Sequence, residues 1–157
     1  MSVRFASAAA LAAVLAAPVL SQARDCTDAA GAFSAEAPES CTSPIGICTH
    51  GKLTGGLRST YDFVADTQDD SGPVASLTGH STITLAKGKS VLHGQDTSTV
   101  AHDNGAFTTT VKVAGGTRQY EHASGTVVAI GTFDFTTHAT KGTYNAHICK
   151  HPASVSK

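Results

Sequence analysis

Residues 107–128 read FTTTVKVAGGTRQYEHASGTVV, and this stretch decides the fold that we expect for the chain. Its first part is rich in threonine and valine, whose β-branched side chains suit a pleated strand and disfavour a helix. Gly115 and Gly116 then interrupt the run, because adjacent glycines reach positive φ angles without steric cost. A second valine-rich run begins at Gly125. The stretch therefore predicts two strands joined by a glycine-containing loop.

The same alternation of apolar segments and turn sequences continues on both sides of this stretch. No segment has a convincing apolar period of 3.6 residues, so helices are not expected. The pattern predicts antiparallel strands at 47–65, 74–86, 90–101, 106–114, 125–135 and 140–149. If the long first and fifth segments each bend into two, the count reaches about eight. We therefore predict an all-β fold, a closed antiparallel β-barrel, because closure removes the exposed edges of a sheet.

The first residues have the pattern of an export signal. Arg4 precedes an apolar run at 8–20, and small residues, Ser21 and Ala23, surround Gln22. This run is too short for a stable membrane span, which needs roughly 20 residues. We expect cleavage near Ala23 and a secreted or periplasmic protein. The predicted organisation is a signal peptide at 1–23, an N-terminal arm at 24–46, a β-barrel domain at 47–149 and a polar tail at 150–157.

Composition narrows the classes of partner. The formal net charge of the 157-residue chain is −1, only 15% of residues are charged, and tryptophan is absent. No basic run indicates nucleic-acid binding. No phosphate loop, nucleotide fingerprint or nucleophile elbow occurs, so no cofactor is predicted. The absence of tryptophan also argues against a lipocalin-like or avidin-like binder, which remains a third hypothesis.

Four cysteines, Cys26, Cys41, Cys48 and Cys149, are expected to form two disulfides in an oxidising compartment. If the predicted strands at 47–65 and 140–149 close the barrel, Cys48 and Cys149 come together. Cys48–Cys149 with Cys26–Cys41 is therefore the preferred connectivity. The pairing of Cys41 with Cys48 and of Cys26 with Cys149 remains open.

The histidines are scattered singly rather than gathered at metal-ligand spacing. Only His147 and His151 are four residues apart, and they lie on either side of a predicted strand end. No metal site is therefore predicted from the eight histidines, which are His50, His80, His93, His102, His122, His138, His147 and His151.

Candidate site residues follow from strand periodicity, because one parity of each strand faces the lumen. Tyr61 with His80 or His93 could transfer a proton at a bound carbonyl or ether oxygen. The predicted ligand-binding residues are Leu57, Tyr61, Phe63 and Phe133. If the opposite parity faces inward, the candidates are Arg58, Asp62, Asp96 and Asp134. Glu121 and His122 lie in the glycine-containing loop, where function often resides.

The segment GGTRQYEHASG at 115–125 resembles the GGTGxFxxAxG signature of allene oxide cyclase and dirigent-like β-barrels. The matching positions are Gly115, Gly116, Thr117, Tyr120, Ala123 and Gly125, while Arg118 replaces a third glycine. The resemblance covers about 104–149. It implies an eight-stranded barrel, often oligomeric, that binds a small hydrophobic molecule and steers its cyclisation or coupling by holding one conformer. No catalytic residue of these families carries over to this sequence.

Two hypotheses about function follow. The first is a secreted barrel that binds a small hydrophobic ligand in its lumen and, if it is an enzyme, has a cyclase-like or isomerase-like activity. The second is a non-catalytic extracellular or envelope protein whose barrel is filled and whose surface binds a partner. An open lumen with convergent polar groups would favour the first hypothesis.

Overall fold

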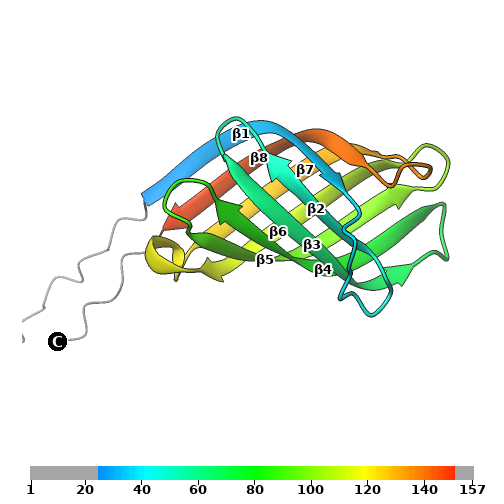
Figure 1. Ribbon diagram of the computed structural model, residues 1–157, viewed down its shortest axis with the longest axis horizontal. Helices are drawn as coiled ribbons and strands as arrows, with labels where there is room; N and C mark the ends of the chain where they lie inside the picture. The colour runs from blue at the N-terminus through cyan, green and yellow to red at the C-terminus, as the bar shows by residue number, and fades with distance from the viewer. Residues whose placement is uncertain (1–24, 151–157) are drawn as a thin grey trace, which may run out of the picture.

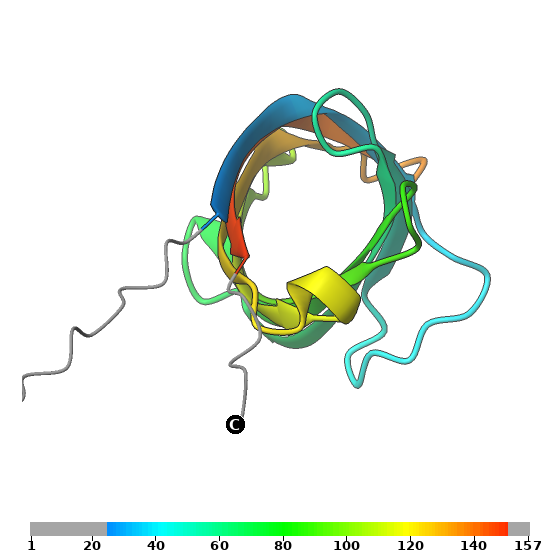
Figure 2. The same cartoon turned by 90° about the vertical axis from the view of Figure 1, so that its left-hand side faces the viewer.

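In the computed structural model, which describes residues 25–150, each strand pairs with the next and the last pairs with the first (Figures 1 and 2). This arrangement is a closed eight-stranded antiparallel barrel and confirms the predicted fold class. The predicted signal peptide and residues 151–157 of the predicted tail lie outside the described residues. The strands are β1 (Asp25–Glu36), β2 (Cys48–Leu53), β3 (Ser59–Asp69), β4 (Val74–Leu85), β5 (Val91–Ala101), β6 (Ala106–Gly116), β7 (Ser124–Phe133) and β8 (Thr140–Lys150).

The prediction of an irregular arm at 24–46 is wrong for most of its length. Residues 25–36 form β1, which pairs with β8 along eleven residues and with β2 at its end. Ahead of the buried Phe33 and Ala35, the inward positions 29 and 31 hold alanine and glycine. Alanine and glycine have weak strand propensity, so this strand has little signal in the sequence.

The segment predicted as one strand at 47–65 is a hairpin of β2 and β3, so the first of the two predicted divisions occurs, as a turn rather than a bend. Gly55 has a φ of +84°, and a Cβ there would come within 2.6 Å of the Ala30 carbonyl oxygen. The turn therefore requires glycine at this point. The second predicted division, of the segment at 125–135, does not occur, because β7 is continuous and β1 supplies the eighth strand.

The preferred disulfide connectivity is also wrong, and the alternative holds. Cys26 is bonded to Cys149, and Cys41 is bonded to Cys48. The reason is the position of β1, which lies between β2 and β8 and places Cys26 directly opposite Cys149 (Figure 2). The seam of the barrel is therefore formed by β1 and β8 rather than by the predicted segments 47–65 and 140–149.

The two ends of the barrel differ. The closed end carries the β2–β3 and β4–β5 turns and the short 3₁₀ helix η1 (Arg118–Tyr120). Buried side chains fill this end, namely Leu85, Leu92, Val113, Ala123 and Ile148. The opposite end, called the open end below, carries the β1–β2, β3–β4, β5–β6 and β7–β8 connections (Figure 1).

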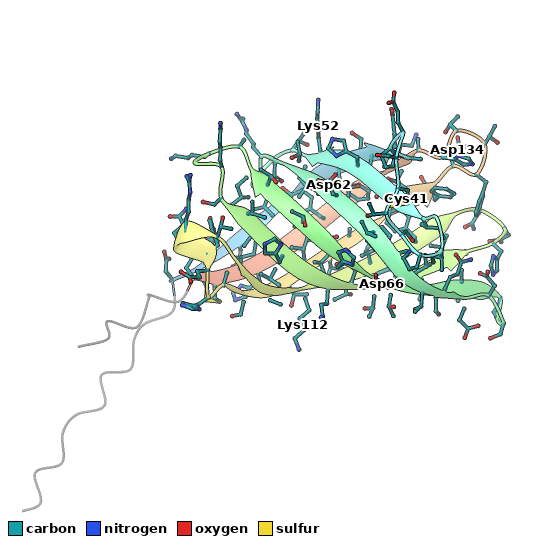
Figure 3. All side chains as sticks on the ribbon, turned by 60° about the horizontal axis from the view of Figure 1, so that its bottom comes forward. Cys41, Lys52, Asp62, Asp66, Lys112 and Asp134 are labelled. Atoms are coloured by element: carbon teal, nitrogen blue, oxygen red, sulfur yellow. A yellow bond between two sulfur atoms is a disulfide. The ribbon has the colours of Figure 1, made fainter. Side chains whose placement is uncertain are left out.

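The outer face of the barrel is mainly polar. Threonines meet across three neighbouring strands, where Thr78 lies opposite Thr97 and Thr97 lies opposite Thr110. Lys52 and Lys112 project away from the barrel wall (Figure 3). Within residues 25–150, no helix has the length and hydrophobicity required to cross a bilayer.

Candidate ligand-binding lumen

The lumen contains a cavity of about 300 Å³. It runs from the middle of the barrel to the open end, where Gln68, Asp70, His102 and Phe135 line it. Phe135 is 52% exposed, so the cavity meets solvent at this end. Several inward side chains, including Tyr61, Phe63 and Phe107, are only half-buried although they face the barrel interior. The interior is therefore incompletely filled by the protein's own side chains.

One wall of the cavity is aromatic. The ring of Phe33 makes an edge contact with Tyr61, with centroids 6.4 Å apart, and a tilted contact with Phe107 at 5.9 Å. Glycines make room for these rings, because a Cβ at Gly131 or Gly142 would come within 2.9 or 2.8 Å of the Phe33 ring. The glycines in the strands thus set the shape of the cavity as well as the bends of the sheet.

The charged group deepest in the lumen is Asp96 of β5. Its residue is 3% exposed, and Ser81 of β4 donates a 2.5 Å hydrogen bond to its Oδ2. The other carboxylate oxygen, Oδ1, has no hydrogen-bond partner among the described residues. Burial raises the pKa of Asp96 from 3.8 to about 6, while the Ser81 hydrogen bond opposes part of this rise. The side chain is therefore close to half-protonated in mildly acidic solution.

Tyr61 of β3 is a second polar group on the cavity wall. Burial raises the pKa of its phenol, and hydrogen bonds with Thr140 and Thr49 act in the opposite direction. The phenol therefore stays protonated at neutral pH, where it can donate or accept a hydrogen bond but does not act as a base. A hydroxyl pair, Ser98 and Thr109, hydrogen-bonded at 2.7 Å, completes the polar groups of the middle of the cavity.

The open end combines aromatic and polar groups. Phe133 contacts Phe135 edge-on at 5.1 Å and stacks on His138 at 6.2 Å. At the same opening, the side-chain amide of Gln68 donates a 2.5 Å hydrogen bond to the carboxylate of Asp70, two residues further along the chain. An amphipathic entrance of this kind can admit a molecule that is largely apolar but carries a polar group.

Three of the four residues predicted to bind a ligand, Tyr61, Phe63 and Phe133, line the cavity. Leu57 does not, because it lies in the β2–β3 turn at the closed end. There its backbone N–H donates a 2.7 Å hydrogen bond to the buried Tyr144 hydroxyl. The predicted contact failed because Leu57 was counted as part of a continuous strand that the Gly55–Gly56 turn interrupts.

The proposed pairing of Tyr61 with His80 or His93 is wrong. Both histidines are exposed on the outer face, where His80 Nδ1 is 3.2 Å from Asp66 Oδ1. Inward positions of β4 have odd numbers, whereas inward positions of β5 have even numbers. Each strand therefore has its own parity, set by the length of the preceding turn.

For the same reason, the four candidates of the opposite parity do not act together. Asp96 is inside the lumen, whereas Asp62 lies on the outer face (Figure 3). There Asp62 Oδ1 is 2.6 Å from His50 Nδ1. Arg58 is exposed in the β2–β3 turn. Asp134 orders the β7–β8 turn by accepting hydrogen bonds from the Thr136 and Thr137 N–H groups, which lower the pKa of its carboxyl.

The loop with the family-like signature is far from the cavity opening. Glu121 and His122 are exposed at the closed end and do not line the cavity. Ala123 is buried in the core, and Arg118 has a φ of +57°, a left-handed conformation that usually favours glycine. Arg118 therefore takes a glycine-like conformation where the signature has its third glycine, and the loop lies at the closed end of the barrel.

Periodicity alone did not identify the small polar groups of the cavity, Ser81, Ser98 and Thr109. They could have been found from their place in the alternation, because each lies on the same face of its strand as apolar residues. Ser81, for example, lies between Gly79 and Ile83 on the inward face of β4. Comparison of the chain with protein-family models and with characterised proteins gives no match.

Proposed function

We propose that this protein is an exported binding protein whose lumen holds one small, largely apolar molecule that carries a hydrogen-bond donor. The observation that carries the proposal is an open apolar cavity whose lining includes Asp96, a buried residue whose Oδ1 has no hydrogen-bond partner among the described residues. A buried polar atom without a partner costs about 1–3 kcal/mol. A ligand hydroxyl or amine that donates to this oxygen would remove that cost.

The size and chemistry of the cavity limit the ligand. A volume of about 300 Å³ is at the small end of the range for ligand pockets. Aromatic rings on one wall favour a flat or cyclic hydrocarbon skeleton, since rings pack well against one another. The ligand class is therefore a small cyclic or conjugated molecule with one hydroxyl or amine group.

A steering activity is a natural extension of binding. The resemblance of 115–125 to allene oxide cyclase and dirigent-like proteins suggests that the bound molecule is held in one conformer that favours cyclisation or coupling. The protonated phenol of Tyr61 is available to orient a ligand oxygen. Positioning by the walls, rather than proton transfer by histidine, is the mechanism that these residues support.

Native mass spectrometry of the protein purified from its own host tests the proposal directly. We expect a co-purifying molecule that is released on denaturation. A protein that is repeatedly empty would instead favour the alternative in which the surface binds a partner.

A binding assay with substitutions in the lumen provides a second test. The probe is N-phenyl-1-naphthylamine, a neutral apolar fluorophore with one N–H donor. Ala129→Phe places a ring in the cavity, whereas Val128→Phe places the same ring on the outer face of the same strand. We expect probe fluorescence to be lost in the first variant and kept in the second. Equal binding by both variants would rule out the lumen as the site.

A further inference from the structure

A second group of reactive side chains lies outside the lumen, at the seam between β1 and β8. The sulfurs of Cys26 and Cys149 and a ring nitrogen of His147 lie within 4.8 Å of one another. His147 Nε2 is 3.5 Å from Cys149 Sγ, and His147 Nδ1 is 2.6 Å from Asp28 Oδ1. A carboxylate, an imidazole and a sulfur are thus arranged in series.

The arrangement results from strand register. Asp28 lies directly opposite His147, and Cys26 lies directly opposite Cys149. Side chains two residues apart share one face of a strand, so all four side chains meet on the outer face. The other disulfide, Cys41–Cys48, is not part of any such cluster among residues 25–150.

We propose that Cys26–Cys149 is a thiol–disulfide exchange site at which a small-molecule thiol forms a mixed disulfide with Cys26. Exposure selects the sulfur that is attacked, because Cys26 is exposed whereas Cys149 is 7% exposed. Attack on Cys26 makes Cys149 the leaving group, and Cys149 is the sulfur beside His147.

The step balances without any further oxidant. The incoming thiolate forms a bond to Cys26 Sγ, and the bond between the two cysteine sulfurs breaks with its electron pair moving to Cys149 Sγ. The imidazolium of His147 donates its Nε2 proton to the thiolate that is released. A second thiol can then displace Cys26 from the mixed disulfide, so that two thiols are oxidised to one disulfide and the protein disulfide is reduced.

Asp28 acts as a positioning residue. Its carboxylate accepts a hydrogen bond from His147 Nδ1–H, which fixes the ring so that Nε2 faces the sulfur. Backbone pairing of β1 with β8 over eleven residues also links the two strands, so the disulfide is not the sole connection across the seam.

The test compares the two disulfides within the same molecule. The full disulfide-bonded protein is incubated with reduced glutathione and, separately, with 2-mercaptoethanol. Free thiols are then alkylated at intervals, and the modified cysteines are identified by mass spectrometry of the digest. We expect the first mixed disulfide on Cys26 and a carbamidomethyl group on Cys149. A mixed disulfide found mainly on Cys149 would overturn the proposal.

Substitution of the histidine separates its chemistry from general stability. His147→Gln and Asp28→Asn should each slow opening of Cys26–Cys149 by about tenfold, which is modest for acid–base assistance. Opening of Cys41–Cys48 in the same samples should be unchanged, and Asp28→Glu should restore the rate. If the ratio of the two disulfide opening rates is the same with glutathione and with 2-mercaptoethanol, electrostatic attraction of glutathione to the site is excluded as the cause. An unchanged ratio of the two opening rates in His147→Gln, with the melting temperature retained, would sink the assignment.

Discussion

Ser81 donates a hydrogen bond of 2.5 Å to Asp96 Oδ2 inside the lumen, while Asp96 Oδ1 has no partner among the described residues. The two residues lie on neighbouring strands, β4 and β5, and both face the cavity. A carboxyl group in this setting is stabilised when it is protonated, because ionisation would leave a partly unpaired charge in an apolar environment. This relationship links the proposed binding site to the pH dependence of stability.

The contribution of Asp96 to the stability of the protein should fall as the pH rises between about 4 and 6. The native pKa of Asp96 is raised from 3.8 to about 6, so the native state holds a proton that the unfolded chain has released in this window. Above pH 6 the Asp96 carboxyl is ionised in the native state as well, and the destabilisation reaches its full value. A difference of roughly two pKa units corresponds to about 3 kcal/mol.

Asp96→Asn removes this cost. We expect the variant to be more stable than the parent by up to about 3 kcal/mol at pH 7.5, with the difference vanishing near pH 4. Urea denaturation followed by circular dichroism at several pH values measures the difference. Asp103→Asn in the exposed β5–β6 turn is the matched control. A gain for Asp96→Asn that does not vary with pH would contradict the explanation.

Tyr144→Phe should destabilise the closed end by about 1–3 kcal/mol, because a buried hydrogen-bond network loses its centre. The Tyr144 hydroxyl accepts a hydrogen bond from the Leu57 N–H and donates one of 2.8 Å to the Thr54 carbonyl, and the residue is 1% exposed. Hydrogen exchange of the Leu57 amide should accelerate at the same time. Unchanged exchange at Leu57 would show that the turn is held by other contacts.

Gly142→Ala should be far more harmful than Gly46→Ala. A Cβ at Gly142 would come within 2.1 Å of the Ile130 carbonyl oxygen and 2.8 Å of the Phe33 ring. At Gly46, where φ is +74°, a Cβ meets nothing within 4 Å, so only backbone strain of about 1 kcal/mol is expected. Thermal unfolding of the two variants provides the comparison. Similar losses in both would mean that the sheet shifts easily around Phe33.

Removal of the seam disulfide should cost more than removal of the loop disulfide. Cys26–Cys149 links residues 123 apart, whereas Cys41–Cys48 links residues 7 apart. Chain-entropy arguments give about 5 kcal/mol for the first and about 2.5 kcal/mol for the second. Urea unfolding of the Cys26→Ser/Cys149→Ser and Cys41→Ser/Cys48→Ser variants measures both. An equal loss would indicate that residual structure already holds the termini together in the unfolded chain.

Much of the wall of the barrel could be read from local sequence. Strands β4, β5, β6 and β8 begin and end within two residues of the predicted segments, since alternating β-branched residues and glycine-containing turns are local signals. Strand β1 had little such signal, because alanine and glycine occupy its inward positions 29 and 31. It becomes a strand through its pairing with β8, which is a contact between distant parts of the chain.

The candidate site was predicted in part for the same reason. Tyr61, Phe63 and Phe133 could be predicted because large inward side chains repeat along single strands. His80 and His93 could not be placed correctly, because the parity of a strand depends on the turn before it. A difference of one residue in a turn reverses which side chains face the lumen.

By itself the sequence determined that this chain forms antiparallel strands and has four cysteines available for two bridges, because strand propensity, turn chemistry and residue counts are local properties. Tertiary structure alone decided which strand closes the barrel, which sulfurs pair and which carboxyl group enters the lumen. These outcomes depend on register between strands far apart in the chain. Register is set by the cooperative closure of the whole sheet, in which burial of one face fixes every strand at once.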